Sequence, residues 1–115
     1  MSRKGRNRTA ARLQAHAPVF AALGDETRLS LVVRLSYGRP RSISQLTAGT
    51  KLTRQAIAKH LRVLQRTGMV HSTRAGRERL FEFNPQPIEG LKQYLALVSA
   101  QWDQALSRLK LFVED

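Results

Sequence analysis

The 115-residue sequence contains no cysteine and only eight acidic residues, and these shortages exclude several classes of protein. Without cysteine the chain cannot form disulfides, bind zinc through thiolates or sense redox change through a thiol. No apolar run approaches the ~20 residues that a membrane-spanning helix needs. The basic N-terminus is not followed by the apolar core of a signal peptide. We therefore expect a cytoplasmic protein that does not insert into a membrane.

The few acidic residues stand against 20 lysines and arginines, which give a net charge of +12 and an isoelectric point near 11.6. The charge is unevenly placed. Residues 1–84 hold 17 basic and 4 acidic side chains, whereas residues 85–115 hold 3 basic and 4 acidic ones. A chain this basic is typical of proteins that bind a polyanion, nucleic acid before an anionic membrane surface. The binding surface should lie in the first 84 residues.

The length favours one domain, which we place at residues 9–115. Residues 1–8 carry four cations and nothing apolar after Met1, so they are predicted to be a disordered basic arm. Such an arm either contacts DNA phosphates or is a solvated tail, and the sequence does not separate the two.

Helical spacing of apolar residues predicts four helices before a hairpin, at 9–23, 26–37, 42–49 and 54–67. Pro18 predicts a new helix start or a kink inside the first of them. Asp25 is the expected N-cap of the second, and Ser42 with Gln45 fits a capping box at the start of the third. The apolar side expected to be buried in the second helix consists of Leu29, Val32, Val33 and Leu35.

The helix at 54–67 divides into two faces. At about 100° per residue, one arc of about 140° holds Arg54, Gln55, Ala58, Lys59, Arg62 and Arg66. The other side holds Ala56, Ile57, His60, Leu61 and Leu64. No acidic residue occurs between Glu26 and Glu78, which is unusual for a merely solvated face. Because arginine pairs with guanine and glutamine with adenine, the first face is predicted to contact DNA.

Alternating residues at 69–74 and 79–83 predict a β-hairpin with a turn at 75–78. Arg74, Arg77 and Arg79 lie around this turn, where they would reach phosphates or a minor groove, or only keep the hairpin soluble. Two close helices followed by a hairpin are typical of a winged helix-turn-helix. The predicted fold class is mainly α with a small β-hairpin.

A last helix is predicted at 85–113, opened by Asn84 and Pro85. Its apolar residues recur every three or four positions along nearly its whole length. A domain this small cannot cover such a stripe, so we predict that it forms a dimer interface, which the first helix would complete. The predicted interface residues are Leu91, Leu95, Val98, Trp102, Leu106 and Leu109.

Three segments together resemble the ArsR/SmtB family of bacterial winged-helix repressors: FAALGDETRLSLVVRL, SISQLTAGTKLTRQAIAKHLRVLQRTGMV and STRAGRERLFEFNP. The resemblance implies a homodimer that binds an operator and represses until a signal arrives. It places the DNA-facing positions at Thr53, Arg54, Gln55, Lys59 and Arg62. His60 matches the family's His-Leu pair, but its inner position favours packing or a single phosphate contact over base reading.

Many members of that family sense metals through cysteines near the positions that Ser42 and Ser44 hold here, or through histidines and carboxylates on the last helix. This chain has histidine only at 16, 60 and 71, without paired spacing on one element. We therefore expect no metal and no cofactor. The effector is unknown.

The sequence thus predicts a sequence-specific DNA-binding transcriptional regulator, a repressor that binds an inverted-repeat operator as a homodimer. The alternatives are a non-specific nucleoid or RNA-binding protein and a dimeric module whose helix-turn-helix binds protein. An enzyme is not expected, because paired carboxylates, a Ser-His arrangement and a glycine-rich phosphate loop are all missing.

Overall fold

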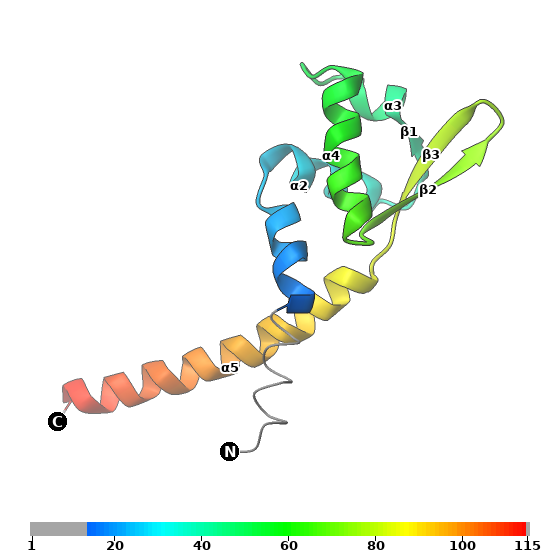
Figure 1. Cartoon of the computed structure of the whole chain (residues 1–115). Coiled ribbons are helices and arrows are strands. Elements are labelled where there is room, and N and C mark those ends of the chain that lie inside the picture. The colour runs from blue at the N-terminus through cyan, green and yellow to red at the C-terminus, as the bar shows by residue number, and fades with distance from the viewer. Residues whose placement is uncertain (1–13, 115) are drawn as a thin grey trace.

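The computed structural model describes residues 14–114, so the predicted basic arm at 1–8 lies outside the described part of the chain. A first helix covers residues 14–23 and is called the N-terminal helix below. It is followed by α2 (Glu26–Leu35), β1 (Arg41–Ser42), α3 (Ile43–Thr47), α4 (Arg54–Arg66), β2 (Val70–Ala75), β3 (Glu78–Phe83) and α5 (Gln86–Glu114) (Figure 1). The predicted order of five helices with a hairpin before the last is confirmed. The chain is helical on both sides of Pro18, so the predicted new start there is wrong.

Helix α2 begins at its predicted cap, and its predicted buried side is confirmed at Val32 and Leu35 but wrong at Leu29 and Val33. The Asp25 carboxylate accepts a hydrogen bond of 3.0 Å from the Arg28 backbone N–H. The buried residues are Leu31, Val32 and Leu35, whereas Leu29 and Val33 are about half exposed. Leucine and valine occur on both sides of this helix, so their spacing could not identify the side that meets the core.

The helix-turn-helix of α3 and α4 has the predicted local chemistry. The Ser42 hydroxyl accepts from the Gln45 N–H at 3.2 Å, and the Gln45 side chain accepts from the Ser42 N–H at 2.9 Å. The Thr53 hydroxyl caps α4 by accepting from the Ala56 N–H at 3.1 Å. Gly68 turns the chain out of α4 with a φ of 80°, which favours glycine.

The three strands form an antiparallel sheet in the order β1-β3-β2. The sequence does not predict strand β1 (Arg41–Ser42), because two residues are too few to show alternation. In the sheet Arg41 pairs with Phe81 and Ser42 with Leu80. The hairpin β2–β3 turns at Gly76 and Arg77 and projects away from the helices as the wing (Figure 1).

One hydrophobic core takes residues from the N-terminal helix, α2, α3, α4, the hairpin and the first turns of α5. Asn84 fixes the start of α5 to the end of α4, because its N–H donates to the Met69 carbonyl at 2.8 Å and its amide to the Gly68 carbonyl at 3.0 Å. Beyond its first turns, α5 extends away from the other described elements over much of its roughly 43 Å length (Figure 1).

Candidate nucleic-acid interface

Helix α4 presents one face to the core and the other to solvent, as predicted. Ile57, Leu61 and Leu64 are at most 1 % exposed. The predicted DNA-facing residues are all exposed, namely Thr53, Arg54, Gln55, Lys59, Arg62 and Arg66. The Thr53 hydroxyl uses one acceptor position as a cap, which leaves its O–H available to a phosphate oxygen. The exposed face therefore carries four cations and two neutral donors and no anion.

One flank of α4 is linked to the wing by hydrogen bonds to the Ser72 hydroxyl. The Gln65 side-chain amide donates to the Ser72 hydroxyl at 3.2 Å, and Arg79 donates to the same oxygen at 3.0 Å. Gln65 and Ser72 could not be identified from the sequence, because a hydrogen bond between a helix and a strand leaves no periodic signal. These two hydrogen bonds link the wing to one flank of α4.

The wing arginines lie on the side of the hairpin that faces α4. Arg74 and Arg79 are direct cross-strand partners and share a face with Ser72 and Phe81, since alternate residues of a strand point the same way. Two like charges placed opposite each other are unfavourable without a counter-anion. Arg77 occupies the turn and is exposed. The three predicted wing residues are thus close together and placed to meet an anion.

The opposite flank of α4 is tied to α2. His60 Nδ1 lies 3.2 Å from an Arg28 guanidinium nitrogen and 3.7 Å from the Asp25 carboxylate. The backbone N–H of Arg28 lowers the pKa of Asp25 by donating to its carboxylate, and the nearby charge of the Arg28 guanidinium lowers it further. His60 therefore packs on the inner flank, and neither Asp25 nor Arg28 was anticipated as its partner.

Helix α3 is held to α2 by a second arginine. Arg34 donates to the Leu46 carbonyl at 2.7 Å and to the Gln45 carbonyl at 3.0 Å. These are the last carbonyls of a short helix, which otherwise lack partners. Arg28 lies in the first turn of α2 and Arg34 in the last. Both arginines thus act on the helix-turn-helix, Arg28 through α4 and Arg34 through α3.

Comparison with known proteins places this geometry in a family. A helix-turn-helix domain family matches residues 23–73. The chain is 40% identical over 79 residues to the HTH-type transcriptional regulator YuzN of Bacillus subtilis, covering 64% of this chain and 86% of that protein. The structure of an ArsR-like transcriptional regulator from Rhodococcus sp. RHA1 is similar with a TM-score of 0.77 at 38% identity, over 92% of this chain and 94% of that one.

The chain belongs to the ArsR-like family of winged helix-turn-helix transcriptional regulators. It is therefore a DNA-binding regulator, and the prediction that it is not an enzyme is confirmed. A further similar structure is the homodimeric winged helix-turn-helix DNA-binding domain Mb0332 of Mycobacterium bovis, with a TM-score of 0.61 at 25% identity over 86% of this chain and 88% of that one.

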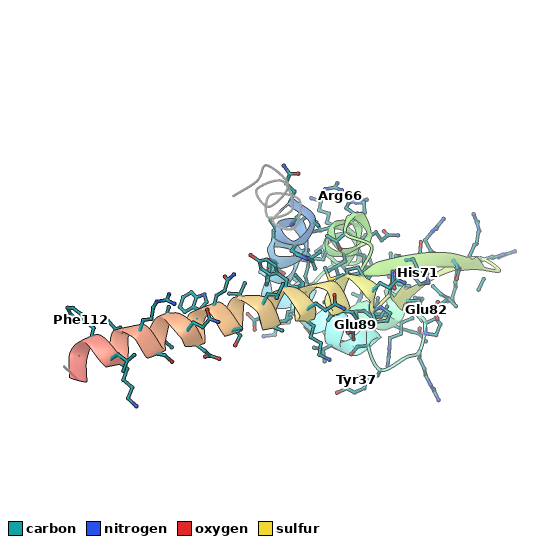
Figure 2. All side chains as sticks on the ribbon, turned by 90° about the horizontal axis from the view of Figure 1, so that it is seen from below. Tyr37, Arg66, His71, Glu82, Glu89 and Phe112 are labelled. Carbon is teal, nitrogen blue, oxygen red and sulfur yellow. The ribbon has the colours of Figure 1, made fainter. Side chains whose placement is uncertain are left out.

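Within residues 14–114 there is no group of three or more histidine and carboxylate side chains that could hold a metal ion. His16 packs on Tyr94, and His60 lies beside Arg28. His71 lies 3.1 Å from Glu82 on the wing (Figure 2). No helix in the described part of the chain is long and apolar enough to cross a membrane.

Helix α5 carries the predicted dimer residues in two different environments. Leu91 is 4 % exposed and packs in the core of its own chain, so its assignment to a dimer interface is corrected. Leu95, Trp102, Leu106 and Leu109 are between 48% and 66% exposed. Val98 is partly buried. Figure 2 shows Phe112 at the far end of the helix, well away from the other elements.

Proposed function

We propose that this ArsR-like regulator binds an inverted-repeat operator as a homodimer and represses transcription from it. The observation that carries the proposal is the pairing of an exposed cationic face on α4 with a buried face of Ile57, Leu61 and Leu64. Helix α4, fixed in this way, can act as the recognition helix, which enters a major groove with its cations and Gln55 turned to the DNA. Such a regulator works where the DNA is, so a cytoplasmic location is part of the proposal.

Three groups of side chains would make different contacts with the DNA. Gln55 and Arg54, in the first turn of α4, would read base edges. Lys59, Arg62 and Arg66 follow along the same exposed face and would contact bases or phosphates. Arg74, Arg77 and Arg79 of the wing would contact the backbone or minor groove beside the major groove.

Dimerisation is supported by the apolar surface of α5. Its large exposed hydrophobic side chains are Leu95, Leu97, Trp102, Leu106, Leu109, Leu111, Phe112 and Val113. A soluble monomer rarely exposes this many large apolar side chains on one helix, and Leu95, Trp102, Leu106 and Leu109 share one side of it. The homodimeric Mb0332 domain has the same fold, which favours a second copy of this chain as the partner.

Repression is the output that this arrangement favours. A two-fold symmetric dimer places its recognition helices about 34 Å apart, in successive major grooves on one side of the duplex. A protein that holds both grooves excludes RNA polymerase from the DNA it covers. The signal that would release it stays unassigned.

The test is to select duplexes bound by the full chain from a random pool and then to measure their affinities. We expect an inverted repeat with half-sites about 10 base pairs apart between centres. Affinity should fall steeply with salt, because several phosphates per protomer are neutralised. A preference below ~10³ over random DNA would instead favour a non-specific nucleic-acid-binding protein.

A further inference from the structure

Arg28 is the one side chain in residues 14–114 for which we find hydrogen bonds to both the N-terminal helix and α4. Its Nε donates to the Ala22 carbonyl at 2.6 Å, and one terminal nitrogen lies 3.5 Å from the Ala21 carbonyl. The other terminal nitrogen lies 3.2 Å from His60 Nδ1. Arg28 thus lies between the end of one helix and the middle of the recognition helix.

The chemistry of this contact fixes the ring of His60. A guanidinium can only donate hydrogen bonds, so Nδ1 must accept and carries no proton when it bonds to Arg28. The neutral ring therefore holds its proton on Nε2. Because His60 lies next to Lys59 and two residues from Arg62, a displacement of the ring would displace side chains of the exposed face.

The N-terminal helix is itself in contact with α5. The His16 and Tyr94 rings lie 5.0 Å apart, and the Phe20 and Tyr94 rings 6.3 Å apart in an edge-to-face arrangement. Gly90 lies beneath His16, and a Cβ there would come within 3.4 Å of the imidazole. A continuous series of contacts therefore runs from α5 through the N-terminal helix and Arg28 to α4.

We propose that Arg28 is a positioning residue that links the N-terminal helix to the recognition helix by donating to His60. A shift of the N-terminal helix against α5 would then change how Gln55, Lys59 and Arg62 meet the bases. The inference rests on the proposed sequence-specific operator binding. Spatial continuity alone does not establish coupling, so the test is a direct measurement of it.

Arg34 provides a matched control on the same helix. It also donates to two backbone carbonyls, but its carbonyls belong to α3 and it makes no described bond to an α4 side chain. Arg28→Met and Arg34→Met each remove a cation and two or more donors while keeping an apolar stem. Only the first should change the ring of His60 and the base preference of α4.

The first measurement uses the free full-length chain and needs no DNA. Ring nitrogen chemical shifts of ¹⁵N-labelled histidine, recorded at about pH 8 where ordinary histidine is neutral, report which nitrogen carries the proton. We expect the Nε2–H form of His60 in the wild type and in Arg34→Met. Arg28→Met should give a mixture of the two forms. An unchanged His60 spectrum in Arg28→Met would overturn the proposal.

The second measurement is the ratio of affinities for a selected duplex and a scrambled one. Arg28→Met and His60→Ala should each lower this ratio about tenfold, the size of one charge-assisted hydrogen bond. The double variant should fall no further, because both changes break the same contact. His60→Asn, which keeps an acceptor near the position of Nδ1, should stay within about threefold of the wild type.

Each contrary result has a distinct meaning. If the losses of the two single variants multiply in the double variant, Arg28 and His60 act independently. If Arg28→Met lowers the affinity for both duplexes equally, Arg28 is a phosphate contact. Either result overturns the proposal. If Arg28→Met does not fold, Arg28→Lys replaces it in the same measurement, because one ammonium group cannot bond to both the Ala22 carbonyl and His60. A wild-type affinity ratio in Arg28→Lys would overturn the proposal. A wild type with no duplex preference would instead refute operator binding, while the ring spectra still decide the Arg28–His60 contact.

Discussion

Helices α4 and α5 both expose one long face, and the two faces have opposite chemistry. The exposed face of α4 is cationic, and both of its flanks are tied to neighbours, at Gln65 to the wing and at His60 to α2. The exposed face of α5 is apolar, and beyond Leu91 little of the described chain packs on it. A rigidly held cationic face suits a polyanion of fixed shape, whereas an uncovered apolar face needs another protein surface.

The comparison also shows why the two helices depend on each other. A single recognition helix reads only a few base pairs, and a second one adds affinity only if it is held at the right spacing. In this chain Asn84 anchors α5 to the end of α4, so the position of α5 determines the position of α4 in the proposed dimer. The predictions below separate the contributions of the two helices.

The largest effect should come from breaking the apolar face of α5. Leu106→Glu together with Leu109→Glu places two charges on side chains that are 59% exposed in the single chain, so the protomer should still fold. We expect a monomer by sedimentation equilibrium. Affinity for the full inverted repeat should fall by about 10²–10⁴, because the two half-sites are then bound independently.

Ser107→Glu is the matched control for this pair, since it adds a charge on the polar side of the same turn of α5. It should remain dimeric and bind the operator like the wild type. If the double variant also remained a dimer at micromolar concentration, the apolar face of α5 would not be the interface.

A smaller and more selective effect is expected on the exposed face of α4. Gln55→Ala should change which base is preferred at one position of each half-site, at a cost of about 1–3 kcal/mol against the best sequence. Repeating the duplex selection with this variant measures the change. An enriched sequence identical to that of the wild type would remove Gln55 from the base-reading residues.

The wing should contribute without altering base preference. Arg77→Ala removes an exposed cation from the turn, so binding should weaken about equally on all duplexes. The slope of log affinity against log salt should become shallower by about 1 per protomer, because one phosphate contact is lost. If the base preferences of Arg77→Ala and Gln55→Ala changed in the same way, the division between wing and helix would be wrong.

The sequence predicted the DNA-binding region better than it predicted the packing between elements. Caps are local, so Asp25 and the pair Ser42 and Gln45 could be assigned from residue type and spacing alone. Strand β1 could not, because a two-residue strand exists only through its pairing with β3. Leu29 and Val33 were misassigned for a related reason, since the buried side of α2 is decided by the elements packed on it.

The hydrogen bonds that link α4 to the wing and to α2 could not be predicted from the sequence either. Gln65 and Ser72 are seven residues apart, and Arg28 and His60 are 32 apart, without a shared pattern. A histidine projected onto the inner side of a helix predicts packing but does not identify its partner. Leu91 has the same spacing as the other apolar residues of α5, and it is buried where Leu95 is exposed only because the core of the domain lies against it.

The smallest predicted effect concerns the cap that begins α2 beside His60. The Arg28 N–H lowers the pKa of Asp25 below its ordinary value of 3.8. The ionised carboxylate therefore adds stability that is fully present above about pH 4 and is lost as the pH falls through the lowered value. Asp25→Asn keeps a capping side chain but cannot ionise, so it serves as the control. Urea unfolding midpoints of the two proteins, measured between about pH 7 and pH 3, should differ at neutral pH and converge in acid. A constant difference across that range would show that the carboxylate charge contributes nothing to holding α2 against the recognition helix.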